Sequence, residues 1–421
     1  MDFAYSPKVE ALRHRVQHFI DEYIRPRIQQ YEEEAQAGIY PISFMADLKE
    51  LAKDEGLWNL FLPHLKDDEP GTRLSNLEYA PLAEIMGRIG WASEVFNCQA
   101  PDTGNMELLH LFATEEQRQQ WLNPLLNGEF HSAFAMTEPD VASSDATNIQ
   151  TLILRDGDDY VINGRKWFIS NAARPDCNVY ILMGKTDPEA ETHKQQSMIL
   201  VPADAEGIDV VRNISVMNHI SLEGHCEIVF RNVRVPASNL LGEEGSGFAL
   251  AQARLGPGRI HHCMRSIGAA ELALALMTER SQERKTFGKF LFQHGVVSDW
   301  IAKSRMEIDQ ARLLVLKSAW MIDEVGAKAA RKEISMIKAV VPGMFGEICD
   351  RAMQTFGAMG VSPDTPLPDM WTWARALRFA DGPDEVHLRS IARLEIKERK
   401  ASLGSTAAYF YLPDARERHS S

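Results

Sequence analysis

The first part of the chain has the hydrophobic period of amphipathic helices. Between Val9 and Ile24 apolar side chains recur every three or four residues, which places them on one helical face. These positions are Val9, Leu12, Val16, Phe19, Ile20 and Ile24. Further along, T114-E-E-Q has the form of a capping box, in which the Thr114 and Gln117 side chains bind the first free amides of a helix. We therefore predict that residues 1–130 are helical.

The pattern changes to alternation between residues 131 and 242. The stretch 149–170 alternates apolar and polar positions, and it contains Asp156-Gly157 and Asn163-Gly164, two dipeptides typical of hairpin turns. Short apolar runs follow at 197–202, 208–212 and 227–236. This part of the sequence predicts an antiparallel β unit.

The helical period returns from about residue 243. Within residues 300–323 a buried stripe is indicated by Ile301, Ile308, Leu314 or Val315, and Ile322. Breaks rich in Gly and Pro at 255–258, 357–368 and 381–383 divide this zone into long helices. The sequence predicts an α+β protein in which helices come first, strands second and helices again last.

Composition narrows the class of protein. The chain of 421 residues has 45% hydrophobic and 25% charged residues, which is ordinary for a globular protein with a large core. A net charge of −14 argues against nucleic acid as the main partner, and no apolar run reaches the ~20 residues of a membrane span. Five scattered cysteines without a C-x-x-C pair indicate a reducing compartment and no metal site. The N-terminus lacks a targeting pattern, so a cytoplasmic location is expected.

One segment raises a question about chemistry. Asp381, Asp384, Glu385 and His387 lie within seven residues, around the turn Gly382-Pro383. Such a turn can carry a general base, or it can simply end one helix and cap the next. From these residues alone the capping interpretation is favoured.

Four other segments carry weak signals. Residues 134–145 contain small polar residues that allow a ligand to lie close to the backbone, and residues 163–172 contain adjacent aromatics followed by Ser and Asn. Residues 283–289 contain two adjacent cations and a Gly between two predicted helices. Residues 354–360 contain two Gly, at which a ligand could approach closely. Each has an ordinary structural explanation, as a turn, core packing or a solvated loop.

Taken together, these motifs resemble the acyl-CoA dehydrogenase family over essentially the whole chain. T-E-P-x-x-x-S-S-D, K-W-x-I-S-N, R-K-T-F-G and Q-x-F-G-x-x-G occur in the family's order and spacing. Residues 97–107, 142–148, 255–265 and 380–388 resemble one subgroup, which in animals is fused behind an aminoglycoside-phosphotransferase-like kinase domain. No such domain precedes the match here, so a stand-alone form is expected. The resemblance implies an N-terminal α-helical domain (1–130), a middle antiparallel β-barrel domain (131–242) and a C-terminal four-helix-bundle domain (243–421).

The family binds FAD and oxidises acyl-CoA thioesters to trans-2-enoyl-CoA. By resemblance, flavin-lining residues would be Phe134, Met136, Thr137, Ser144, Phe168 and Ser170, with Ser170 bonding to flavin N5 and Ser144 also near the thioester. Pro383 and Glu385 join the cofactor set. Residues that would reach the FAD of a neighbouring subunit are Arg284, Thr286, Gln354, Gly357 and Ala358, which implies a homodimer or homotetramer.

The same resemblance puts Asp381 at the position of the catalytic base. Arg259 would lie beside it below the substrate, and Gly382 would contact the substrate. The thioester oxygen would bind the amide N–H of the base and a ribityl hydroxyl. Burial is expected to raise the basicity of the carboxylate. Some members carry the base just before the arginine, where this chain has Gly258, so Asp381 has no rival.

Several features depart from the family pattern. The base is Asp instead of Glu, Pro383 replaces a threonine, and Gly295 stands where many members have a polar side chain. Asp102 is expected in the wall of the acyl pocket. His261, His262 and His387 are assigned to surface or packing roles, because two adjacent histidines on a helix cannot face one site together.

The leading expectation is a dehydrogenase that passes electrons to electron-transfer flavoprotein. The alternatives are a flavin oxidase of the same fold, like the nitroalkane oxidases that use an aspartate base, and a CoA-ester or flavin binding protein without turnover. Rapid reoxidation of reduced flavin by O₂ would indicate the oxidase, and flavin not bleached by any acyl-CoA would indicate the binding protein.

Overall fold

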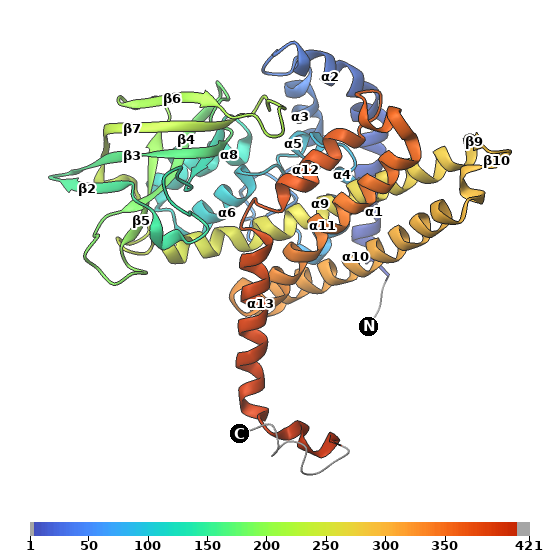
Figure 1. Cartoon of the computed structure of the whole chain (residues 1–421). Helices are drawn as coiled ribbons and strands as arrows, with labels where there is room; N and C mark the ends of the chain where they lie inside the picture. The colour runs from blue at the N-terminus through green and yellow to red at the C-terminus, as the bar shows by residue number, and fades with distance from the viewer. Residues whose placement is uncertain (1–3, 411–421) are drawn as a thin grey trace.

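The computed structural model describes residues 4–410 of the chain, coloured by residue number in Figure 1. The N-terminal part is helical, as predicted, and the six apolar positions from Val9 to Ile24 are all buried. The predicted capping box is confirmed, with Thr114 Oγ1 accepting from the Gln117 N–H at 3.2 Å and Gln117 Oε1 accepting from the Thr114 N–H at 3.1 Å. The helical segments are α1 (Pro7–Phe19), η1 (Ile20–Ile24), η2 (Arg25–Arg27), α2 (Ile28–Gln36), α3 (Met45–Asp54), α4 (Asn76–Met86), α5 (Ala92–Val95), α6 (Asp102–Phe112), α7 (Glu115–Gln117), η3 (Arg118–Leu122) and α8 (Asn123–Asn127).

The middle part forms an eight-stranded sheet with the path β6-β7-β3-β2-β4-β5-β8, and β1 pairs with β4 beside this path. Most pairs are antiparallel, as predicted, but β1–β4 and β2–β4 are parallel. Alternation along one strand carries no information about the direction of its partner. The strands are β1 (His131–Ala135), β2 (Leu152–Asp156), β3 (Asp159–Ser170), β4 (Cys177–Lys185), β5 (Gln196–Pro202), β6 (Ile208–Asn213), β7 (His225–Pro236) and β8 (Leu240–Leu241).

The two predicted hairpin turns have different outcomes. Asp156-Gly157 does turn the chain between β2 and β3, but the prediction for Asn163-Gly164 was wrong, because these residues lie inside β3. The physical reason is a close contact: a Cβ on Gly164 would lie 2.3 Å from Thr151 Oγ1 on the neighbouring segment. This glycine permits close packing at a register shift of the sheet and does not reverse the chain.

The C-terminal part consists of long helices and one projecting arm (Figure 1). The breaks predicted at 357–368 and 381–383 are confirmed, but the break at 255–258 is wrong, because α9 continues through Pro257. A hairpin of β9 (Lys285–Thr286) and β10 (Lys289–Phe290) joins α9 to α10. The helical segments are α9 (Gly247–Glu283), η6 (Leu291–Gln293), α10 (Gly295–Ala329), α11 (Arg331–Phe356), η7 (Gly357–Val361), α12 (Leu367–Leu377), α13 (Asp384–Arg399), η8 (Lys400–Ser402) and η9 (Ser405–Tyr409), with η5 (Ala237–Asn239) and η4 (Ala146–Asn148) in the middle part.

Helix α9 joins the N-terminal helices to the C-terminal ones, because it packs against α4 and α6 and also against α10 and α11. Its approach to α4 is very close: a Cβ on Gly268 would lie 1.7 Å from Glu84 O, and one on Gly87 would lie 2.0 Å from Arg265 O. Glycine is therefore required at this crossing. Within residues 4–410, no helix is both long and apolar enough to cross a membrane.

Candidate active site

Asp381 lies on a sharp turn between α12 and α13. Its backbone has φ +55°, and Gly382 follows with φ +106°. Pro383 then caps α13, and Asp384 accepts a hydrogen bond from Arg378 Nε at 2.6 Å across the turn. The capping interpretation holds for Asp384 and Glu385, which form the first turn of α13, while Asp381 faces α9 and its role as a general base stays a prediction.

The carboxylate of Asp381 rests on one stripe of α9. Its Oδ2 atom would lie 3.5 Å from a Cβ at Gly258, so the absence of a side chain there makes room for it. One helical turn further, His262 Nε2 lies 3.5 Å from the same oxygen. Arg259 Nε donates to the Asp381 carbonyl oxygen at 2.9 Å, so Arg259 holds the backbone of the turn and not its carboxylate.

A second cation supports the turn from α11. The buried Lys338 donates to the Leu377 carbonyl oxygen and lies 3.5 Å from the Gly382 carbonyl oxygen. The neighbouring amides of Ala380 and Gly382 bond to Ala376 O and Phe379 O. The Asp381 N–H, by contrast, has no acceptor among the described residues, so it can donate to a ligand.

The charges around Asp381 favour its ionised form. Burial raises the pKa of the carboxyl group, but His262, Arg254, Arg259 and Lys338 lower it, and the pKa lies below its usual value. Burial also holds the pKa of His262 at about 3, so this ring is neutral at pH 7 and the three cations are the groups that keep Asp381 ionised. Burial thus acts in the expected direction, but in the ligand-free protein the neighbouring cations outweigh it, and the effect of burial against flavin and acyl chain stays a prediction.

Arg254 connects this turn to the sheet. Its guanidinium carbon lies 4.0 Å from the centre of the Phe134 ring on β1, and its Nε donates to Asn105 Oδ1 on α6 at 2.8 Å. Burial lowers the pKa of Arg254, and Asp381 and Glu107 are the first two groups that raise it. Burial raises the pKa of Glu107 to about 8, so at neutral pH Arg254 gains little compensation from that side chain.

The T-E-P segment after β1 is held by β3. Thr137 Oγ1 donates to Trp167 O at 2.6 Å, and the Trp167 N–H donates to Thr137 O at 3.0 Å. Beneath them Lys166 Nζ donates to Met136 O, Glu138 Oε1 and Met183 O at 2.7–2.8 Å. These contacts fix the backbone, while the side chains of Phe134, Met136 and Thr137 stay half-buried.

Of the other predicted flavin-lining residues, Phe168 and Ser170 lie at the end of β3 and Ser144 lies between β1 and β2. Phe168 has φ +53°, which is strained for a bulky residue, and its ring is 45% exposed. Ser170 Oγ lies 3.0 Å from His225 Nδ1, and Ser144 is exposed. An exposed aromatic ring held in strained backbone beside a hydroxyl group is suited to stacking against a ring-shaped ligand.

Asp102 is buried, and its hydrogen bonds favour a structural role over the predicted role in the acyl wall, which stays a prediction. Its carboxylate accepts hydrogen bonds from the Ser132 N–H at 2.7 Å and Asn171 Nδ2 at 3.1 Å, and it lies 2.6 Å from His131 Nδ1. Both carboxylate oxygens are thereby committed to fixing α6 against β1. A sequence cannot show this, because the three partners come from distant segments.

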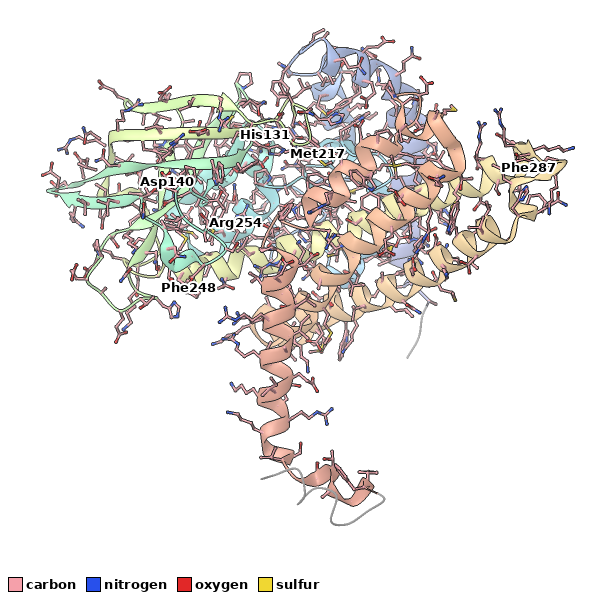
Figure 2. All side chains as sticks on the ribbon, viewed as in Figure 1. His131, Asp140, Met217, Phe248, Arg254 and Phe287 are labelled. Carbon is pink, nitrogen blue, oxygen red and sulfur yellow. The ribbon has the colours of Figure 1, made fainter. Side chains whose placement is uncertain are left out.

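Five predicted site residues lie away from Asp381 in this protomer. Figure 2 shows Phe287, at the tip of the β9–β10 hairpin, at the opposite end of the molecule from Asp140, while Arg254 lies between sheet and bundle. Arg284 and Thr286 belong to this hairpin, and Gln354, Gly357 and Ala358 are exposed where α11 ends. Gly295 has open space around it, and no contact explains its identity.

Sequence reasoning missed several contacts of the turn. His262 was assigned to a surface or packing role, but it lies beside Asp381; His387 is buried, with Nε2 3.1 Å from a Cβ built on Gly382. His261 does pack in the core, against Tyr79. The spacing of Arg254, Gly258 and His262, four residues apart on α9, is the sequence signal that places them on one side of a helix.

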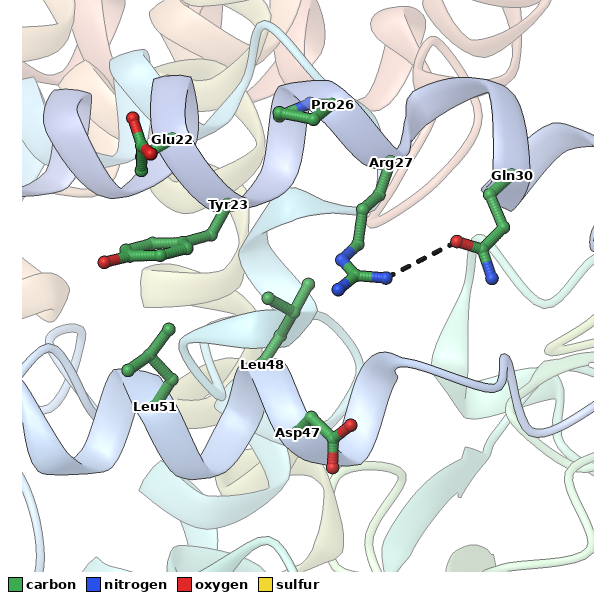
Figure 3. A pocket seen from close by; sticks show the side chains of 8 residues that line it. All are labelled: Glu22, Tyr23, Pro26, Arg27, Gln30, Asp47, Leu48 and Leu51. Atoms are coloured by element: carbon green, nitrogen blue, oxygen red, sulfur yellow. Dashed lines mark hydrogen bonds between the residues drawn. The ribbon is translucent and has the colours of Figure 1, made fainter.

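Two hollows lie elsewhere, one on the N-terminal helices and one between these helices and the middle part. Figure 3 shows one of about 380 Å³ between the segments of Tyr23 and Leu48, in which Arg27 bonds to Gln30 at 3.4 Å. A second of about 230 Å³ is lined by Lys49, Glu94, Arg174 and Glu223 among others. Neither includes a residue of the Asp381 turn, of the 134–138 segment or of the 168–170 segment, so neither is the candidate active site.

Comparison with known proteins agrees with this architecture. Sequence profiles of the acyl-CoA dehydrogenase N-terminal, middle and C-terminal domains match residues 6–129, 133–233 and 245–395. The chain is 56% identical over 411 residues to probable acyl-CoA dehydrogenase FadE2 of Mycobacterium tuberculosis, covering 96% of this chain and 99% of that one. It is 48% identical to human acyl-CoA dehydrogenase family member 11, covering 95% of this chain but 52% of that longer protein.

Solved structures give the same result. A chain from Mycobacterium abscessus assigned as an acyl-CoA dehydrogenase superposes with a TM-score of 0.90 at 46% identity, covering 94% of this chain and all of that one. The order of the three domains, the turn at Asp381 and the profile matches over most of the sequence together establish that this chain belongs to the acyl-CoA dehydrogenase family.

Proposed function

We propose that this protein is an FAD-dependent dehydrogenase that converts an acyl-CoA thioester to its trans-2-enoyl-CoA, with Asp381 as the base that removes the α-proton. The observation that carries this proposal is the Asp381 turn. It combines an ionised, largely buried carboxylate with an N–H of the same residue that has no acceptor within residues 4–410.

The segments 134–137 and 168–170 of the middle part fit a flavin. Phe134, Met136, Thr137, Phe168 and Ser170 combine partly uncovered aromatic and apolar side chains with two hydroxyl groups, of which that of Thr137 donates to Trp167 O. The Ser170 hydroxyl can act as donor and acceptor, so its contact with His225 leaves capacity for a ligand. When bound, FAD would supply the hydride acceptor at its N5 atom.

Asp381 would act through both its side chain and its backbone. The α-proton of a thioester is weakly acidic, so negative charge that develops on the thioester oxygen must be stabilised while the carboxylate takes the proton. The free Asp381 N–H is a donor of this kind, and loss of one such donor typically costs about 3 kcal/mol of transition-state stabilisation. Arg259 and Lys338 hold the carbonyl side of the turn, which orients that N–H.

An oligomer is part of the proposal. Arg284 and Thr286 lie at the β9–β10 hairpin, whose Phe287 side chain is 94% exposed, and Figure 1 shows this hairpin well away from the connection between α12 and α13. In a homodimer or homotetramer this hairpin, together with Gln354, Gly357 and Ala358, would complete the cofactor site of a neighbouring subunit. Loss of flavin from Arg284→Ala, with the fold retained, would support this arrangement.

The acceptor of the electrons would be an electron-transfer flavoprotein. The use of Asp as the base keeps a flavin oxidase as the second candidate, because nitroalkane oxidases share this residue type. The two differ in how reduced flavin is reoxidised. Rapid reoxidation by O₂ without an acceptor protein would overturn the dehydrogenase proposal.

The decisive experiment is an anaerobic titration of the holoprotein with acyl-CoAs of varied length and hydroxylation, following flavin absorbance. We expect at least one thioester to bleach the flavin. Asp381→Asn should bind the same thioester and reduce flavin at least about 10³-fold more slowly, since it lacks the base. Parental rates in Asp381→Asn would exclude Asp381 as the base.

A further inference from the structure

His262 is the uncharged polar side chain that faces the Asp381 carboxylate. It comes from α9, one turn after Gly258, and its Nε2 atom lies 3.5 Å from Asp381 Oδ2. This is the outer limit of a hydrogen bond, and catalytic hydrogen bonds are often long before substrate binds. The ring is largely enclosed, with the Trp373 ring 6.1 Å away in an edge-to-face arrangement.

The tautomer of His262 is fixed by its other nitrogen. Arg265 Nη2 lies 3.3 Å from His262 Nδ1, and Arg265 Nη1 is anchored on the Cys98 carbonyl oxygen at 3.1 Å. An arginine can only donate hydrogen bonds, so Nδ1 must accept and carry no hydrogen. A neutral ring then has its hydrogen on Nε2, directed at Asp381. The three residues thus lie in a row: Arg265 donates to His262 Nδ1, and His262 Nε2 faces the carboxylate at 3.5 Å, from where it can donate once the site tightens around a ligand.

We propose that His262, with its tautomer set by Arg265, is a positioning residue that holds one carboxylate oxygen of Asp381 and leaves the other free to take the substrate α-proton. This inference rests on the proposed function. It gives the short aspartate a fixed orientation, because a donor on Oδ2 and the open space over Gly258 together select one rotamer of the carboxylate.

Charged groups near the same carboxylate also influence its pKa and therefore any pH effect. Arg254 and Arg259 come from α9 and Lys338 from α11, while on α13 Asp384 acts on Lys338 and His387 lies against the backbone of Asp381 and Gly382. The three cations attract the carboxylate from several sides, so they favour its charge. His262 differs from them because it is a neutral donor with one defined direction.

The test compares His262→Leu with His262→Gln, whose amide can still donate. We expect His262→Leu to lower the rate of flavin reduction about tenfold, to shift the acid limb of its pH profile upward by about one unit, and to leave KM unchanged. The direction follows because loss of a donor to the carboxylate raises the pKa of Asp381. His262→Gln should recover most of both effects.

His261→Leu is the matched control, since it removes the adjacent buried imidazole, which packs on Tyr79. It should keep the parental pH inflection. A readout independent of turnover is the Asp381 rotamer in crystal structures of the variants, which should change in His262→Leu and persist in His262→Gln.

A parental rate and inflection in His262→Leu would overturn the positioning role. Equal losses of rate in His262→Leu, His262→Gln and His261→Leu, together with loss of flavin, would also overturn this role, because they would show damage to the fold. If Asp381→Asn stays active, the proposed function fails instead, and the two failures are thereby distinguished.

Discussion

Lys166 and Glu138 form an ion pair at 2.8 Å in which the lysine side chain has no exposed surface. The same ammonium group donates to the carbonyl oxygens of Met136 and Met183, so all three of its hydrogens are used. Glu138 in turn accepts from the amides of Gln150 and Thr151. The pair therefore fixes the backbone that carries Phe134, Met136 and Thr137, the side chains proposed to line the flavin.

Removing one partner should leave the other charge buried without compensation. We expect Lys166→Met to lower the free energy of unfolding by about 3–5 kcal/mol and to weaken flavin retention. Denaturant unfolding and the flavin-to-protein absorbance ratio measure the two effects. Lys317→Met, which breaks an exposed pair with Glu333, is the control and should change stability by less than about 1 kcal/mol. Equal effects in both variants would show that the burial of Lys166 has no special importance.

Glu107 should make the protein less stable as the pH rises. Burial raises its pKa to about 8, above the ordinary value of 4.5, so between these values the folded chain holds a proton that the unfolded chain has released. Burial of the protonated carboxyl group therefore costs no stability by this effect below pH 4.5, and the free energy of unfolding decreases as the pH rises from 4.5 to 8. Glu107→Gln, which needs no proton, should raise the free energy of unfolding by on the order of 2 kcal/mol at pH 7.5 and have little effect at pH 4.5. A gain of the same size at both pH values would contradict this assignment.

Gly268 should not tolerate even one added methyl group. Its Cβ would lie 1.7 Å from the Glu84 carbonyl oxygen, and neither helix can move without disturbing the core between α4 and α9. We expect Gly268→Ala to cost at least about 3 kcal/mol, measured by thermal and denaturant unfolding. Gly343→Ala in α11, where no atom lies within 4 Å of the added group, should instead stabilise by about 0.5–1 kcal/mol.

Asp102 gives a prediction that separates structure from specificity. Asp102→Asn keeps the shape of the side chain but loses the charge paired with His131, so we expect about 3 kcal/mol lower stability. Because its oxygens face β1, the preference for acyl chain length should stay the same. Activity across an acyl-CoA series checks this, and a changed preference would restore Asp102 to the pocket wall.

The order of the elements could be predicted from hydrophobic periods, because each helix or strand buries a face that is local in sequence. Motif spacing also identified the Asp381 turn. What could not be predicted were contacts between remote segments: Arg254 against Phe134, His262 beside Asp381, and Lys338 beneath Gly382. The predicted turn at Gly164 and the predicted helix break at Pro257 were wrong for the same reason. Tertiary packing overrides the local preference of Gly for turns and of Pro for helix ends.

The hydrogen bonds that Asp102 accepts from Ser132 and Asn171, and its contact with His131, have a practical consequence for building hybrids of related enzymes. A middle segment taken from a relative would bring its own residues to the contact with α6. If these lacked the partners of Asp102, its carboxylate would be buried without hydrogen-bond donors. Recombination at residue 130 should succeed only when donor and recipient share this quartet, whatever their overall likeness.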